Sequence, residues 1–145
     1  MNLVMREKRI KYPPNGFRVC IDSRESDIGG VAYSPLVEQE ITYNGINELI
    51  LEMDRIFDQK GYPQAFQEKR SFFSRKKSST PYRGVPEVIP DAEKIYEKTG
   101  KIFTVDVVVE ARRNASWQGY IRPVDGAKIK RYQGELELLQ LLLEY

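Results

Sequence analysis

The chain has 145 residues, enough for one domain or for two small halves that share a core. Its 23 basic and 21 acidic residues leave a formal net charge of +2, which gives no global argument for binding to nucleic acid or to a membrane. No apolar run approaches the roughly 20 residues of a membrane-spanning helix, and no apolar segment of a secretory signal follows the basic residues 1–11. We expect one domain over residues 1–145, in the cytoplasm and without a membrane partner.

The chain contains no histidine and a single cysteine, Cys20. It cannot build a Ser-His-Asp or Cys-His nucleophile, and it lacks the ligands of the usual zinc sites. Acidic residues gather in two short groups, Asp22, Glu25 and Asp27, and Glu38 and Glu40. Either group offers oxygen ligands to a hard cation, but the spacing is not that of an EF-hand, so solvated loop charges are the preferred interpretation. We expect a protein that is not an enzyme, with no cofactor and no metal.

The first half of the chain predicts three strands followed by a helix. The strands are expected at residues 17–21, 31–33 and 40–43, with a reversal at Gly29-Gly30. Apolar residues then recur at spacings of three and four from Ile46 to Phe57, which predicts an amphipathic helix. Gly45 is the expected N-cap of that helix and Gly61 its expected end.

Residues 62–101 are expected to link the two halves, and their first part is basic and aromatic. Lysine and arginine contact phosphates while aromatic rings stack on bases, so this part is a candidate nucleic-acid contact. The candidate residues are Lys69, Arg70, Phe72, Phe73, Arg75, Lys76 and Lys77. A solvated linker is the simpler interpretation, because charge runs are usually soluble surface. Asp91 to Thr99 is expected to form a short helix that Asp91 caps and Gly100 ends.

The second half repeats the plan of three strands and a helix. Residues 103–111 form a long β-branched run with valine on both faces, which predicts a central strand. Strands at 118–124 and 128–132 follow, joined by the hairpin signal Asp125-Gly126. Leucines from Leu136 to Leu143 cover more than one helix face, so this helix is expected to need cover on two sides.

An offset of 89 positions superimposes the two halves without a gap between residues 17 and 54. Seven residues of the second half then fall on identical ones of the first: Val108, Arg113, Gly119, Tyr132, Gly134, Glu137 and Leu138. They include turn glycines and a helix start, where backbone geometry restricts the choice of residue. We therefore predict an α+β fold of two tandem β-β-β-α repeats with pseudo-twofold symmetry. Its sheet is mostly antiparallel with the helices on one face; repeat 1 covers about 17–61, the basic linker 62–101 and repeat 2 about 102–145.

The loop of the second half carries the densest group of recognition side chains. Its candidate partner contacts are Arg112, Arg113, Asn114, Trp117 and Gln118, of which arginine and tryptophan are the types that dominate interface energies. The alternative is a hairpin loop in which the tryptophan packs on the leucine-rich helix. The first half favours this alternative, because an isoleucine stands at the position that matches the tryptophan.

Residues 113–119, Arg-Asn-Ala-Ser-Trp-Gln-Gly, precede a helix that opens Gly-Glu-Leu-Glu-Leu-Leu at residues 134–139. This combination resembles a small protein family of Clostridia-type gut bacteria in which one β-β-β-α unit makes most of the chain. The match covers roughly residues 103–145, and the first half matches more loosely. The resemblance implies a bacterial cytoplasmic protein and carries no activity, substrate or site.

Taken together, these patterns favour a non-enzymatic binding or assembly module that contacts another protein or a second copy of itself as a homodimer. The leucine-rich helix and the Trp117 loop are the expected contact surfaces. Nucleic-acid binding through residues 69–77 is the alternative and is less favoured, because acidic residues on both expected helices dilute the positive charge.

Overall fold

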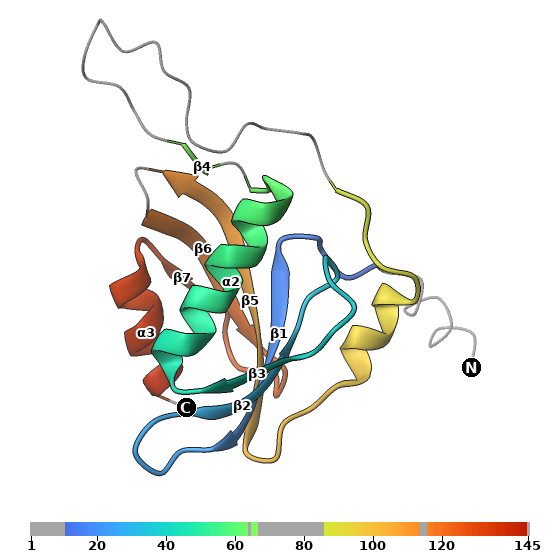
Figure 1. Cartoon of the computed structure of the whole chain (residues 1–145). Helices are drawn as coiled ribbons and strands as arrows, with labels where there is room; N and C mark the ends of the chain where they lie inside the picture. The colour runs from blue at the N-terminus through green and yellow to red at the C-terminus, as the bar shows by residue number, and fades with distance from the viewer. Residues whose placement is uncertain (1–10, 64, 67–85, 114–115, 145) are drawn as a thin grey trace, which may run out of the picture.

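The computed structural model describes residues 11–63, 65, 66, 86–113 and 116–144 (Figure 1). The protein is α+β, with a seven-stranded sheet in the order β3-β2-β1-β5-β6-β7 and β4 paired with β5 beside this path. The strands are β1 (Gly16–Ser23), β2 (Gly29–Tyr33), β3 (Ile41–Asn44), β4 (Ala65–Phe66), β5 (Phe103–Arg113), β6 (Ser116–Pro123) and β7 (Lys130–Tyr132). All neighbours on the main path are antiparallel, and β4 alone among the described strands pairs in parallel. The predicted class and mostly antiparallel sheet are confirmed.

Strands β1 and β5 lie side by side at the centre of the sheet, where Phe17 faces Val107 and Val19 faces Val105. The central position predicted for residues 103–111 is therefore confirmed. Residues from Thr104 to Val109 are buried throughout, because both faces of β5 are covered over this stretch. A continuous valine-rich run is the composition that such a strand requires.

Two helices, α2 (Ile46–Lys60) and α3 (Glu135–Leu143), pack their apolar residues on the same face of the sheet (Figure 1). The largest fully buried side chains of this core are Phe17, Ile21, Ile28, Tyr43, Leu49, Met53, Ile56, Phe57, Trp117, Ile121 and Tyr132. Leu138 and Leu142 of α3 join the same cluster. However, Leu136 is 69% exposed and Leu143 is 46% exposed, so the described residues do not supply the second cover that was expected for this helix.

On the opposite face of the sheet, Tyr12 and the 3-10 helix η1 (Ala92–Glu97) contact the central strands β1 and β5 through Arg18 and Asp106. The expected helix at 91–99 is therefore shorter and more tightly wound. Asp91 does stand at its N-cap, but in the left-handed conformation with φ of 64° and without a side-chain cap hydrogen bond. Ala92 and Ile95 are its buried residues.

Both long helices begin after a glycine, and in each a glutamate of the first turn accepts a hydrogen bond from a backbone N–H that precedes the helix. Glu48 accepts a hydrogen bond from Asn44 N at 2.7 Å, and Glu137 accepts one from Gln133 N at 2.8 Å. In α2 the Asp27 carboxylate adds an acceptor for Ile46 N, so this loop acid has a structural role at the positive end of the helix. The helix ends at Gly61, whose φ of 66° is the left-handed geometry that favours glycine.

Two glycines let a tyrosine hydroxyl reach a central strand. Tyr43 donates to the Cys20 carbonyl at 2.9 Å and Tyr132 donates to the Val108 carbonyl at 2.8 Å. A Cβ atom at Gly119 would lie 1.9 Å from the Val108 oxygen, and a Cβ at Gly30 would lie 2.1 Å from the Cys20 oxygen. Burial raises the pKa of both phenols, so the hydroxyls remain donors.

The strand register departs from the gap-free offset of 89. Gly30 pairs with Ile21 and Gly119 pairs with Val109, so the glycines are 89 positions apart while their partners are 88 apart. Each pairing contains a register shift, located between Ile21 and Ser23 in β1 and between Val109 and Ala111 in β5. A bulge absorbs an extra residue without changing the face on which later side chains point.

Candidate functional site

The predicted partner contact at the Trp117 loop is largely interior. Arg112 is 3% exposed and Trp117 is 1% exposed. The Arg112 guanidinium donates to the Pro63 carbonyl at 2.7 Å, to Asp58 at 2.9 Å and to Asp54 at 3.2 Å. The Trp117 indole N–H donates to the same Asp54 at 3.3 Å. These two side chains join β5 and β6 to α2.

The packing interpretation of Trp117 is the one that fits, with a different partner from the one expected. Its ring meets Phe57 of α2 edge-on at a centroid distance of 5.9 Å. The Arg112 guanidinium lies over the Phe57 ring, 5.5 Å from its centroid. Gln118 is half-buried on the opposite face and donates to the Ser116 carbonyl. The Arg113 side chain, Asn114 and the candidate residues Lys69 to Lys77 lie outside the described residues, so the nucleic-acid contact stays a prediction.

A second polar centre, which the sequence did not indicate, lies beneath η1. Asp106 is 2% exposed and accepts from Tyr12 Oη at 2.5 Å, from Arg18 at 2.7 and 2.9 Å and from Arg122 at 3.1 Å. Burial and the Asp106 charge raise the pKa of the Tyr12 phenol well above its ordinary value. Arg18 also donates to the carbonyls of Tyr96 and Lys98, which fixes η1 to the sheet. These hydrogen bonds join β1, β5, β6 and η1 around one buried carboxylate.

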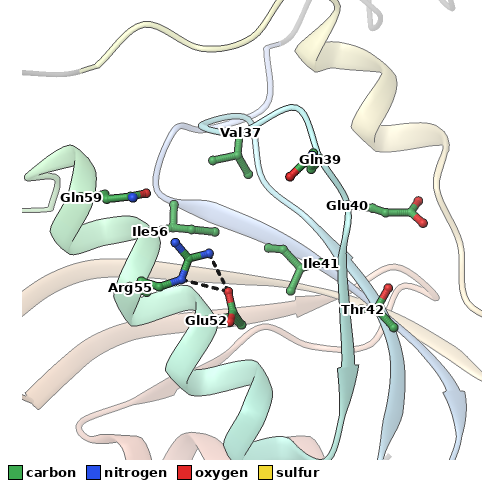
Figure 2. A pocket seen from close by; sticks show the side chains of 9 residues that line it. All are labelled: Val37, Gln39, Glu40, Ile41, Thr42, Glu52, Arg55, Ile56 and Gln59. Atoms are coloured by element: carbon green, nitrogen blue, oxygen red, sulfur yellow. Dashed lines mark hydrogen bonds and ion pairs between the residues drawn. The ribbon is translucent and has the colours of Figure 1, made fainter.

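The candidate site is a groove of about 360 Å³ between α2 and the edge strand β3, which we call the α2–β3 groove (Figure 2). Its nine lining residues are Val37, Gln39, Glu40, Ile41, Thr42, Glu52, Arg55, Ile56 and Gln59. Val37, Ile41 and Ile56 point toward one another and form an apolar floor (Figure 2). Glu52, Arg55 and Gln59 recur at spacings of three and four, so they form one polar stripe of α2 above that floor.

One side of β3 has no neighbouring strand among the described residues. Within the part of the chain that the structure describes, β3 pairs with β2 and with no other strand. Gly45 N donates to the Ile28 carbonyl at 2.9 Å, which fixes the hydrogen-bonding phase of the β2–β3 pair. In an antiparallel pair, the backbone groups of successive residues face the neighbouring strand and the opposite side in turn. The backbone groups of Ile41 and Tyr43 therefore face β2, and those of Thr42 and Asn44 face outward. Glu48 takes the Asn44 N–H. The Thr42 N–H and C=O are left facing the open edge.

The groove carries a negative charge. Two glutamates and one arginine line it, for a formal charge of −1, and Arg55 is bound to Glu52 at 2.7 Å. The Glu40 side chain points to the other side of β3, away from α2 (Figure 2), where it lies 3.5 Å from Tyr33 Oη. Burial and the Glu40 charge raise the pKa of the Tyr33 phenol. Lys98 lies over the Tyr33 ring and offsets part of this charge.

The groove combines polar side chains with an apolar floor. Its polar side chains are carboxylates, amides, one hydroxyl and one guanidinium, and none of its lining residues is a cysteine. Among the residues that the structure describes, no group of three or more acidic or cysteine side chains gathers as a metal site would require. Likewise, none of the described helices has the length and apolar character to span a bilayer.

Comparison with protein-family models, with curated proteins and with solved structures finds no match for this chain. The resemblance of residues 103–145 to a Clostridia-type family therefore stays a prediction. The fold and the groove carry the functional argument alone.

Sequence reasoning found the parts of the groove but not the groove. It assigned the strand at 40–43 and the polar side of the helix at 46–57, and it noted Glu38 and Glu40 as paired acids. The edge position of β3 depends on strand order, which pairing between distant segments decides. A signal was present in the length of the strand, because edge strands are often very short and β3 has four residues.

Proposed function

We propose that this protein is a non-enzymatic protein-binding module that takes an extended peptide segment onto the free edge of β3, within the α2–β3 groove. The observation that carries the proposal is the outward-facing Thr42 backbone beside an apolar floor. An added strand gains main-chain hydrogen bonds from the edge, and pockets for its alternate side chains give specificity. Cytoplasmic location, as the sequence predicts, belongs to the same proposal.

Three structural features support this use of the groove. The free edge is short, four residues in β3, so it exposes a limited template and not a long flat one that invites aggregation. The helix α2 stands directly beside the edge, since it begins two residues after β3 ends. The apolar floor of Val37, Ile41 and Ile56 faces the side on which alternate residues of an added strand would point.

We also infer that the fold consists of two tandem β-β-β-α units related by a pseudo-twofold axis. The strand order places β1 next to β5, β2 and β6 outside them, and β3 and β7 at the two ends. The paired tyrosine and glutamate hydrogen bonds of the two halves support the inference. In this view the β3 edge and the β7 edge are equivalent positions, and α2 is the longer helix, with 15 residues against 9 in α3.

Peptide addition is tested by nuclear magnetic resonance with a neutral probe, acetyl-Ser-Thr-Val-Thr-Val-Thr-Ser-amide. We expect the amide signal of Thr42 to shift and its hydrogen exchange to slow when the probe is added. The matched control is the same peptide with N-methyl groups on alternate residues, which removes the donors that face the protein edge. Equal binding of the methylated peptide, in both registers of methylation, contradicts strand addition.

A matched pair of variants tests the same contact from the protein side. Thr42→Pro removes the outward N–H, and proline is tolerated on an edge strand whose N–H faces away from its neighbour. Thr42→Val keeps the N–H and the β-branched shape. We expect Thr42→Pro to abolish probe binding while Thr42→Val retains it, with both variants showing the same unfolding midpoint within error.

A further inference from the structure

The partner of the α2–β3 groove is defined further by the charge around it. Glu38 precedes the lining residues Gln39 and Glu40, and Glu48 binds the last residue of β3. Acidic side chains therefore flank both ends of the edge strand, in addition to Glu40 and Glu52 in the lining. Both Glu38 and Glu40 are exposed, so their carboxylates are available to an arriving chain.

Few described cations balance these acids. Arg55 pairs with Glu52 at 2.7 Å, and Lys98 lies over the Tyr33 ring near Glu40. Four glutamates against these two bases leave a formal charge of −2 along the groove and its ends. This local excess contrasts with the +2 of the whole chain. A local field of sign opposite to the net charge selects its partner by charge and also speeds encounter with it.

From these observations we propose that the occupant of the groove is a basic extended segment of another protein, in which lysine or arginine alternates with small aliphatic residues. The inference rests on the proposed strand addition. The aliphatic side chains point to the floor of Val37, Ile41 and Ile56, while the basic ones lie on the far side of β3 with Glu40 and Thr42. The period of two follows from strand geometry.

A second copy of this chain is the competing occupant, and the charges disfavour it. In a two-fold pairing of β3 with its symmetry mate, the register that centres on Thr42 sets each Glu40 opposite Asn44 of the other copy. Each Asn44 N–H already belongs to Glu48, and the pairing brings the acidic ends of both edges together without new cations. Like charges brought close across a sheet edge are destabilising.

The test compares three blocked peptides on the full chain by calorimetric titration. They are acetyl-(Lys-Val)₄-amide, its glutamate counterpart acetyl-(Glu-Val)₄-amide, and the neutral threonine-valine probe. We expect the lysine peptide to bind most tightly and the glutamate peptide most weakly, with the advantage of the lysine peptide decreasing as sodium chloride rises from 0.05 to 0.5 M (about 14 to 4 Å of screening length). Equal affinities of the lysine and glutamate peptides overturn the inference.

Charge-neutral variants locate the effect. Glu40→Gln is expected to lower the lysine-peptide affinity roughly fourfold, the Coulomb value for one charge pair at about 5 Å in water. Glu52→Gln is expected to lower it less, because Glu52 lies on the α2 side of the groove and is paired with Arg55. The matched control is Glu93→Gln on η1, an exposed acid away from the lining residues, which should leave the affinity unchanged. An equal loss in the control variant contradicts a site at the groove.

The outcomes separate this inference from the proposed function. Binding of all three peptides with the same affinity, still lost in Thr42→Pro, overturns the basic partner and leaves strand addition standing. Equal binding of a lysine peptide and its N-methylated form overturns strand addition itself. A dimer in sedimentation analysis that becomes a monomer in Thr42→Pro assigns the edge to a second copy and overturns the peptide partner.

Discussion

Removal of the Asp106 carboxylate is expected to destabilise the protein more than any exposed charge change. Asp106 is 2% exposed and accepts four hydrogen bonds, two of them from Arg18, whose side chain is 4% exposed. Asp106→Ala leaves the Arg18 charge buried without its partner, and breaking such a pair costs about 3–5 kcal/mol. Because a domain has roughly 5–15 kcal/mol of total stability, this is a large share.

The assay is urea unfolding followed by circular dichroism at pH 7. Arg122→Ala is the matched control, because Arg122 contacts the same carboxylate but its side chain is 45% exposed, so its loss should cost about 1 kcal/mol or less. Arg18→Met combined with Asp106→Ala should cost less than the two single changes together, by about 0.5–3 kcal/mol of interaction energy. Strict additivity, or a cost below about 1 kcal/mol for Asp106→Ala, would refute the reasoning.

Two further predictions concern the tyrosine and glycine contacts of the sheet. Gly119→Ala places a Cβ 1.9 Å from the Val108 carbonyl oxygen, so the backbone must move, and the change should cost more than about 2 kcal/mol in urea unfolding. Gly126→Ala is the control: it has open space around it but a φ of 96°, and it should cost about 1–2 kcal/mol. Burial raises the folded-state pKa of Tyr43 and Tyr132 above the value of about 10 of a phenol in the unfolded chain. Their contribution to stability is therefore fully present below about pH 10 and decreases at higher pH, where the unfolded chain loses the phenol protons first. Unfolding midpoints between pH 8 and 11 should therefore fall steeply above pH 10 and less steeply in the double variant Tyr43→Phe with Tyr132→Phe; an equal fall in both proteins would contradict this assignment.

Arg112 and Trp117 illustrate that the residue types common in binding sites also serve in a core. Arginine and tryptophan are frequent in binding sites, and the Trp117 loop concentrates both. In the fold, the same side chains satisfy Asp54 and Asp58 of α2 and pack on Phe57. Large side chains with polar tips serve interfaces and cores for the same reason, since each buries much area and keeps a donor for a partner. The sequence does not show whether these side chains face a partner or the core, because α2, which they contact, lies more than 50 residues away from the loop.

Local sequence patterns were sufficient to predict most helices and strands of this protein. Periodicity of apolar residues is a property of one segment, and it located α2, the central strand β5 and the helix starts at Gly45 and Gly134. Backbone requirements are local too, which is why Gly61 could be assigned to the end of a helix before any contact was known. The 3-10 winding of residues 92–97 was missed, because Arg18 from β1 binds the carbonyls that end it.

Tertiary structure alone decided which surfaces are open. Strand order depends on pairing between distant segments. It places β3 at an edge beside α2, so that the Thr42 backbone faces outward next to an acidic groove. The same pairing buries Arg112 and Trp117 and encloses Asp106 among cations from β1 and β6. Burial, and with it the strength of each charge interaction, is set by neighbours that no local pattern contains.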